Sequence, residues 1–188
     1  MTGSVSPRRA DTRRNHERIL AVAAESLSSS AELSFNAIAK QAEVGVGTVY
    51  RHFPTPEALI LAVYQREVDH LVNVVPRLLA EYQPEEAFRV WTTDYLAHYM
   101  MSKRGLANAL TVATRSRGQL PVSAYEAMVG AVTTLLKANA DAGNVRDGLD
   151  PQTVLRGLAG LLYLGPDEDW RGETAALTDL LWRGMRKD

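Results

Sequence analysis

Residues 33–60 read LSFNAIAKQAEVGVGTVYRHFPTPEALI, a pattern that predicts two short helices joined by a turn and followed by a longer helix. Its first part predicts a short helix that Ser34 caps with its side-chain oxygen. One face of this helix is apolar and consists of Phe35, Ile38, Ala39 and Ala42. Two glycines around Val46 then indicate a turn, and a second short helix follows it. Pro54 and Pro56 end that second helix, and Pro56 also suits the first position of a long helix after it.

A short supporting helix, a tight turn and a second short helix form a helix-turn-helix, in which the second helix enters the major groove of DNA. The leading end of the second helix would let the backbone approach a duplex, because its residues are small: Gly45, Val46, Gly47 and Thr48. Tyr50, Arg51 and His52 then supply hydroxyl, guanidinium and imidazole donors suited to phosphates or base edges. The alternative is a helical hairpin in which Tyr50 and His52 are ordinary, partly buried polar aromatic residues. Periodicity, turn, cap and donor cluster agree with one another and favour the DNA-binding interpretation.

With the helix before it, this motif covers residues 13–64 and resembles the TetR family of bacterial repressors. The family signature is an initial helix, this motif and a Tyr-x-His-Phe ending, which is Tyr50–Phe53 here. The resemblance implies contacts with the DNA backbone from Ser34, Lys40, Tyr50 and His52. It implies contacts with the bases from Val46, Gly47 and Thr48. Arg51 could contact either.

Two residues depart from the family pattern. Glu43 stands at the turn position where the family usually has Gly, so the turn either accepts a left-handed residue or takes a slightly different shape. Pro56 stands where Lys is frequent as a phosphate anchor, so that contact is absent. Arg51 or the arginine-rich N-terminus could compensate for it.

The net charge of −1 hides an uneven distribution. Residues 1–53 hold seven Lys and Arg against five Asp and Glu residues, while the rest of the chain holds 14 against 17. Four arginines lie close together near the N-terminus: Arg8, Arg9, Arg13 and Arg14. We expect them to form a mobile basic arm ahead of a first helix that begins near Thr12, and Arg14 to contact the phosphate backbone. The alternative is a solvated, disordered tail.

The whole chain has helical rather than strand periodicity, so we expect an all-α protein of about nine helices. We divide it into a helix-turn-helix domain with its basic arm at residues 1–55 and a helical domain for ligand binding and dimerisation at residues 56–188. Pro76 should end or kink the long helix before it. One helix should then run through Phe88, Trp91, Tyr95 and Tyr99. Gly143 and Asp150-Pro151 indicate a helix end and a helix start.

A helix-turn-helix dimer needs an interface that holds its two heads at a fixed spacing. The last two helices are the best candidates, because small residues among their leucines permit close approach. The candidate interface residues are Leu155, Leu158, Leu161, Leu162, Leu177, Leu181 and Met185. The alternative for each is internal core, while the resemblance implies a four-helix bundle made from this pair on two chains.

Aromatic and thioether side chains gather between the head and the last two helices. They suit an adaptable apolar pocket for a small-molecule effector, although core packing is the alternative for any one of them. The candidate pocket residues are Phe88, Trp91, Tyr95, Tyr99, Met101, Tyr125 and Met128.

Asp94 and His98 lie one helical turn apart and suggest a metal or acid-base pair, but a metal site needs a third ligand and the other histidines lie elsewhere. We therefore expect a polar pair at the surface or at a pocket rim, with no metal and no cofactor. The chain has no cysteine, no HExxH motif, no phosphate-binding loop and no GxSxG elbow, which argues against an enzyme.

The N-terminus carries no apolar run, and no long uncharged apolar stretch occurs, so we expect a cytoplasmic protein without a membrane span. The leading hypothesis is a repressor homodimer that a small molecule releases from operator DNA. The alternative is a related activator or a regulator that responds to no ligand.

Overall fold

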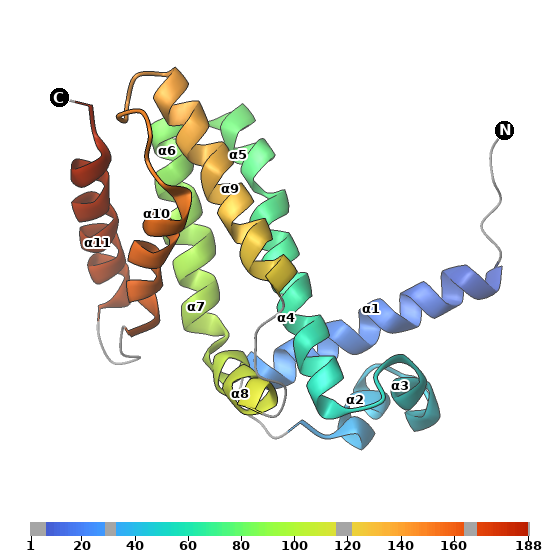
Figure 1. Ribbon diagram of the computed structural model, residues 1–188. Coiled ribbons are helices and arrows are strands. Elements are labelled where there is room, and N and C mark those ends of the chain that lie inside the picture. The colour runs from blue at the N-terminus through green and yellow to red at the C-terminus, as the bar shows by residue number, and fades with distance from the viewer. Residues whose placement is uncertain (1–6, 29–32, 116–121, 164–168, 188) are drawn as a thin grey trace, which may run out of the picture. The chain divides into compact units, whose positions relative to one another are not determined.

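The computed structural model describes residues 7–28, 33–115, 122–163 and 169–187, and within these ranges the chain is built from helices (Figure 1). The predicted all-α class is confirmed. The described residues form two compact units, one containing the residues up to Arg66 together with Lys103–Arg115, and the other containing Glu67–Ser102 and the residues from 122 onward. The boundary between the units lies after Arg66, inside the helix Pro56–Asn73, whereas the predicted boundary after residue 55 lies just before that helix. The helix Arg104–Arg115 joins the first unit because it packs against the helix Pro7–Ser28.

The first unit contains the predicted helix-turn-helix. Its elements are α1 (Pro7–Ser28), α2 (Phe35–Gln41), α3 (Val46–His52), the first part of α4 (Pro56–Asn73) and α8 (Arg104–Arg115). The contacts that define the unit join α1 to α2, α2 to α3 and α1 to α8. Its core includes Ile19, Leu20, Ala23, Leu27, Ile38, Val49, Phe53 and Leu59.

The expectation of a mobile basic arm ahead of the first helix is wrong from Pro7 onward, because α1 begins at Pro7 rather than near Thr12. Proline suits the first turn of a helix, and neither Gly nor Pro interrupts the residues that follow. Arg14 also forms an ion pair with Asp11 three residues earlier, a spacing that supports helix. The side chains of Arg8 and Arg9 lie outside the described residues.

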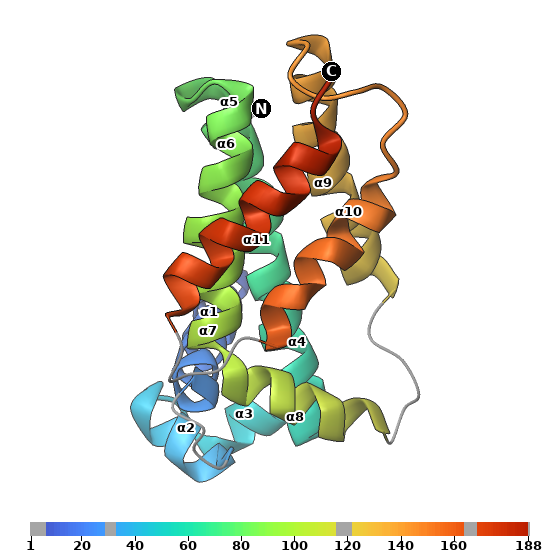
Figure 2. The same cartoon turned by 90° about the vertical axis from the view of Figure 1, so that its left-hand side faces the viewer.

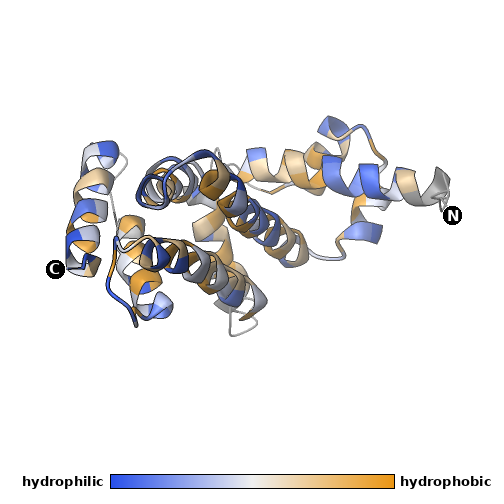
Figure 3. Ribbon diagram, turned by 90° about the horizontal axis from the view of Figure 1, so that it is seen from above, coloured by the Kyte–Doolittle hydropathy of each residue, from blue (hydrophilic) through white to orange (hydrophobic). Residues whose placement is uncertain are grey.

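The second unit consists of α5 (Val75–Glu81), α6 (Pro84–Val90), the π-helical segment η1 (Trp91–Ala97), α7 (His98–Ser102), α9 (Val122–Asp141), α10 (Pro151–Leu158), the 3-10 segment η2 (Ala159–Tyr163) and α11 (Trp170–Met185). Helix α9 packs against α5, α6 and α10, while α11 packs against η1 and α10 (Figure 2). The helices of the chain carry both hydrophobic and hydrophilic residues, as expected of amphipathic helices that bury one face (Figure 3). The sequence signals at Gly143 and Asp150 are confirmed: Gly143 has a φ of 76° after α9, and the Asp150 carboxylate accepts from the backbone N–H of Thr153 at 3.1 Å.

The long helix ends before Pro76 as predicted, since α4 stops at Asn73 and α5 begins at Val75. Leu71 contributes one of the last four carbonyls of α4, which a helix leaves without an intrahelical partner. The indole Nε1 of the fully buried Trp91 donates to this carbonyl at 2.9 Å. The end of α4 is therefore tied to the core of the second unit.

The single helix predicted through Phe88 and Tyr99 contains the π-helical segment η1. Two threonine hydroxyls donate to backbone carbonyls there, from Thr92 to Phe88 at 2.9 Å and from Thr93 to Arg89 at 3.0 Å. Such side-chain bonds compete with the regular helical ladder. Among the described helices, none combines the length and the apolar character that crossing a membrane would take.

The turn between α2 and α3 accepts Glu43 in a left-handed conformation rather than changing its shape. Glu43 adopts a left-handed conformation with a φ of 51°. Its carboxylate accepts a hydrogen bond from the guanidinium of Arg18 in α1 at 2.5 Å. The turn thus keeps the geometry that suits glycine, and an exposed ion pair with α1 accompanies it.

We predict that Glu43→Val lowers the free energy of unfolding of the first unit by about 1 kcal/mol or more, because a β-branched residue fits positive φ poorly. Glu43→Gln is the matched control: it loses only an exposed ion pair and should cost less than about 0.5 kcal/mol. Urea unfolding followed by circular dichroism measures both. Equal losses for the two variants would assign the effect to the ion pair instead.

Candidate functional site

The N-terminal end of α3 is exposed and carries small side chains. Gly45 caps the helix, Val46 is 40% exposed, and a Cβ added to Gly47 would meet no atom within 4 Å. The helix buries only Val49 of its seven residues. The surface predicted to approach DNA bases is therefore open in the first unit.

Arg51 lies back along α3. Its Nε donates to the carbonyl of Gly47 at 3.2 Å, and its Nη2 donates to the Oγ1 of Thr48 at 2.9 Å. The guanidinium and the threonine hydroxyl therefore form one polar group on the exposed side of the helix. A guanidinium has five N–H donors, so others remain for a base edge or a phosphate.

Tyr50 flanks this surface and is 55% exposed. Its ring lies 4.9 Å from the ring of Phe35, which is buried at the start of α2. Ser34 caps α2 as predicted, with its Oγ accepting from the backbone N–H of Ala37 at 3.4 Å. Lys40 is exposed in the last turn of α2.

Histidines from two helices meet on the other flank of α3. The ring of His52 lies 5.4 Å from that of His16 in α1, and His16 in turn stacks on Phe53 at 4.9 Å. These two histidines line an open hollow of about 300 Å³ together with Thr12 and Arg13. Partial burial, followed by the neighbouring His16 and Arg51, lowers the pKa of His52 below its ordinary value of 6.5. The hollow thus gathers nitrogen donors that an anion would stabilise.

Arg13 and His16 belong to this group and were not predicted as members of it from the sequence. Arg13 was expected in a mobile arm and His16 was assigned to no site, whereas Arg13 is exposed on α1 and His16 is partly buried beside it. Their spacing of three residues, which places them on one face of a helix, was the available signal. Arg14, the predicted phosphate contact, forms its ion pair with Asp11 within α1.

The residues predicted to line a ligand pocket are divided between core and surface. Phe88, Trp91 and Met128 are buried, Tyr95, Tyr99 and Met101 are partly buried, and Tyr125 is exposed. The Tyr95 hydroxyl accepts from Arg77 at 2.6 Å, and the Phe88 ring lies 5.4 Å from that of Trp182. None of these seven residues lines the hollow of about 460 Å³ that opens in the second unit.

That hollow is lined by Thr93, Asp94, His98, Trp170, Arg171, Thr174 and Ala175. Asp94 and His98 therefore lie at a pocket, which is one of the two places expected for this polar pair. Among the described residues, no three His, Cys, Asp or Glu side chains form a group that could hold a metal ion.

The residues predicted for a dimer interface also fall into two groups. Leu158, Leu161 and Met185 are buried within the chain itself, so other side chains of the same chain already cover them. Leu155, Leu177 and Leu181 are partly exposed, and the side chain of Leu162 lies outside the described residues. The most exposed leucine on α11 is Leu180, at 68%.

Comparison with known proteins agrees with this architecture. Residues 19–63 match the family model described as bacterial regulatory proteins, tetR family. Residues 83–187 match the model described as the C-terminal domain of SbtR-like transcriptional regulators.

Solved structures and sequence relatives agree as well. The TetR transcriptional regulator SCO0520 from Streptomyces coelicolor is 38% identical, with a TM-score of 0.73, and the match covers 91% of this chain and 98% of that one. A TetR transcription regulatory protein from Mycobacterium vanbaalenii is 31% identical, with a TM-score of 0.70, over 96% of this chain and 100% of its own. The HTH-type transcriptional regulator SAUSA300_2515 of Staphylococcus aureus is 24% identical over 71% of this chain and 73% of that protein.

The two family models together cover the helix-turn-helix and most of the second unit. The second helix of a helix-turn-helix, here the exposed α3, is the element that enters the DNA groove in such proteins. The chain therefore belongs to the TetR family of DNA-binding transcriptional regulators.

Proposed function

We propose that this protein is a cytoplasmic repressor that binds operator DNA as a homodimer and leaves it when a small molecule binds. The observation that carries the DNA-binding part is the exposed end of α3, where Thr48 and Arg51 form one polar group. Tyr50 flanks this group on one side, and the hollow of Arg13, His16 and His52 flanks it on the other. In this proposal Val46, Gly47, Thr48 and Arg51 meet the bases, while the flanking groups, Ser34 and Lys40 meet phosphates.

Dimerisation is supported by the apolar surface of the last two helices. Leu180 is exposed, and the partly exposed Leu155, Leu177 and Leu181 lie on the same pair of helices. Helices α10 and α11 approach closely, since a Cβ added to Gly157 would lie 2.9 Å from Leu181. Two copies of this pair would form a four-helix interface and hold two recognition helices at the spacing of two half-sites.

Release by a ligand is supported by α4, which carries core residues of both units. Leu59 and Val63 are buried in its first part, and Val68 and Leu71 are buried beyond Arg66. A ligand that prefers one arrangement of the second unit would therefore act on a helix that begins four residues after α3. A coupling of about 1–3 kcal/mol would change DNA affinity by about 5- to 150-fold.

An activator or a regulator without a ligand would use the same α3. A gel shift with the promoter of the neighbouring gene, with and without candidate effectors, separates a regulator that a ligand releases from one that responds to no ligand, and a reporter gene behind that promoter separates a repressor from an activator. A repressor of the proposed kind loses the shifted band when its effector is added.

Two substitutions distinguish base contacts from phosphate contacts on an operator selected from random DNA. Thr48→Ala should change the sequence preference, because it removes a hydroxyl and the partner that holds Arg51. Arg13→Gln should weaken binding to operator and to random DNA equally, and should reduce the salt slope of log affinity by about one. Fluorescence anisotropy over a salt series measures both effects.

Arg14→Gln is the control for Arg13, since Arg14 is the next residue and pairs with Asp11. We expect the smaller change in salt slope from Arg14→Gln. A larger change in salt slope from Arg14→Gln than from Arg13→Gln would show that Arg14, and not Arg13, contacts the phosphate. An unaltered operator preference in Thr48→Ala would show that Thr48 does not read the bases.

DNA affinity should also depend on pH. The pKa of His52 is lowered below 6.5 in the free protein, so its imidazole is neutral at about pH 7.5. A neighbouring phosphate favours the imidazolium, so DNA binding takes up a proton and affinity rises as the pH falls toward 6 and below. The His52→Gln variant should lose much of this rise, whereas His70→Gln, which alters a histidine near the end of α4, should keep it. A pH profile unaffected by His52→Gln would exclude the phosphate role.

The Leu180→Arg variant should be a monomer with poor operator affinity, because it places a charge on the proposed interface. Leu180 is 68% exposed, so the fold itself should tolerate the change. Val112→Arg is the matched control, since Val112 is 67% exposed on α8 of the first unit, and it should remain a dimer. Light scattering during size-exclusion chromatography measures the mass, and a dimer of Leu180→Arg would refute this interface.

A further inference from the structure

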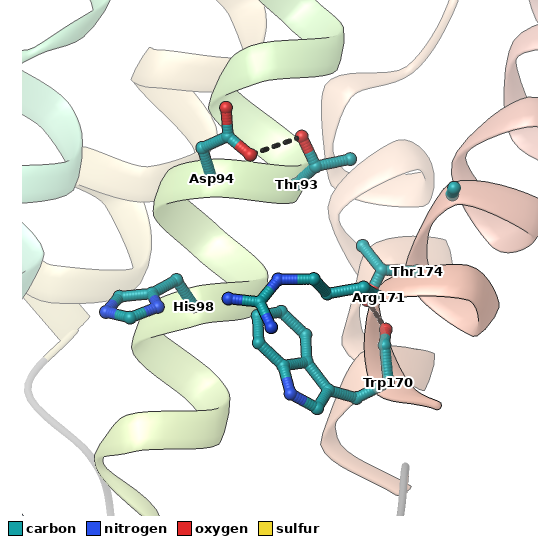
Figure 4. Close-up of a pocket in the computed structure, with 7 residues that line it drawn as sticks. Thr93, Asp94, His98, Trp170, Arg171 and Thr174 are labelled. Carbon is teal, nitrogen blue, oxygen red and sulfur yellow. Dashed lines mark hydrogen bonds between the residues drawn. The ribbon is translucent and has the colours of Figure 1, made fainter. Parts of the chain in front are cut away.

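The hollow in the second unit lies between two elements that pack against each other, the η1–α7 segment and α11 (Figure 4). Thr93, Asp94 and His98 form one wall, and Trp170 and Arg171 form the facing wall. Thr174 is buried and donates its hydroxyl to the carbonyl of Trp170 at 2.6 Å. The volume of about 460 Å³ falls within the range of small-molecule sites.

The two walls carry opposite charges that do not pair. The Thr93 hydroxyl shares its one proton between the Arg89 carbonyl at 3.0 Å and the Asp94 carboxylate at 3.1 Å. Within the described part of the chain, the Asp94 carboxylate has no ion pair. Arg171 likewise forms no ion pair with a described residue. By contrast, the neighbouring Asp179 on the same helix pairs with both Arg89 and Arg183. As far as the described residues go, the hollow therefore presents a carboxylate and a guanidinium without ion-pair partners to the same occupant.

Aromatic rings hold the cationic wall in place. The guanidinium of Arg171 lies over the indole of Trp170, 4.4 Å from its centroid, and the ring of His98 lies 6.4 Å from the same indole (Figure 4). Stacking restricts the arginine before a ligand arrives, which lowers the entropic cost of binding a carboxylate. The indole and the methyl group of Ala175 leave an apolar part of the wall beside these charges.

A singly charged ligand would leave one wall charge without a partner. An anion bound by Arg171 would occupy a hollow that the Asp94 carboxylate also lines, and a cation bound by Asp94 would share it with the Arg171 guanidinium. A molecule with both an ammonium and a carboxylate satisfies both walls. We propose that this hollow binds a free α-amino acid with an aromatic side chain, whose ammonium contacts Asp94, whose carboxylate contacts Arg171 and His98, and whose ring packs on Trp170.

Isothermal titration calorimetry on the full chain without DNA tests this proposal, so its outcome is independent of DNA binding. The probes are L-phenylalanine, 2-phenylethylamine, which lacks the carboxylate, and phenylacetate, which lacks the ammonium. We expect L-phenylalanine to bind at least about ten-fold more tightly than either analogue, as the loss of a charge-assisted hydrogen bond implies. Equal affinity for phenylacetate and L-phenylalanine would overturn the zwitterion assignment, and no binding of any probe at millimolar concentration would overturn the site.

Substitutions in the two walls test whether the ligand binds in the hollow. Asp94→Asn should weaken L-phenylalanine about ten-fold or more and leave phenylacetate within about two-fold, whereas Arg171→Gln should weaken phenylacetate and leave 2-phenylethylamine unchanged. Glu173→Gln is the control, because Glu173 is exposed on α11 and does not line the hollow. Circular dichroism verifies the fold of each variant. Unchanged affinities in both Asp94→Asn and Arg171→Gln would place the ligand elsewhere.

Tryptophan emission gives an independent readout, since L-phenylalanine does not absorb where indole is excited. The emission change on adding L-phenylalanine should disappear in Trp170→Phe, which retains Trp91 and Trp182. A change that persists in that variant would also contradict the assignment.

Discussion

The DNA-binding surface depends on the burial of two side chains, Val49 within α3 and Phe53 directly after it. An isolated helix of seven residues is not stable in water, because nucleation costs more than so few hydrogen bonds return. Val49 and Phe53 therefore hold α3 against the rest of the first unit, while Thr48 and Arg51 remain at the surface. His16 stacks on Phe53 from α1, so the same anchor that fixes α3 also brings the histidine pair together.

Local chemistry predicted much of this architecture. The caps at Ser34 and Asp150, the end of α9 before Gly143 and the break before Pro76 each follow from residues that are adjacent in the sequence. The start of α1 was misplaced, because a run of arginines suggests solvated chain as readily as helix. The histidine pair could not be predicted, since its members are 36 positions apart and only the packing of α1 against the helix-turn-helix brings them together.

Apolar periodicity identifies a face but does not say what covers it. Leu158 and Leu161 lie on such a face, and the chain covers them itself, while Leu180 on the neighbouring helix stays exposed. The aromatic cluster gave the same ambiguity: Phe88 and Trp91 fill the core, and the hollow opens instead beside Asp94 and His98. The spacing of Asp94 and His98 was visible in the sequence, but Arg171 reaches the same hollow from a helix more than 70 positions away.

The bond from the Trp91 indole to the Leu71 carbonyl has a mechanical consequence. A break in a long helix, with a proline just beyond it, would ordinarily serve as a hinge. Here the last turn before the break is instead bonded to a large, fully buried ring, which restrains the junction between α4 and α5. A displacement of Trp91 within the core of the second unit would therefore also displace the last turn of α4, since both lie in that unit.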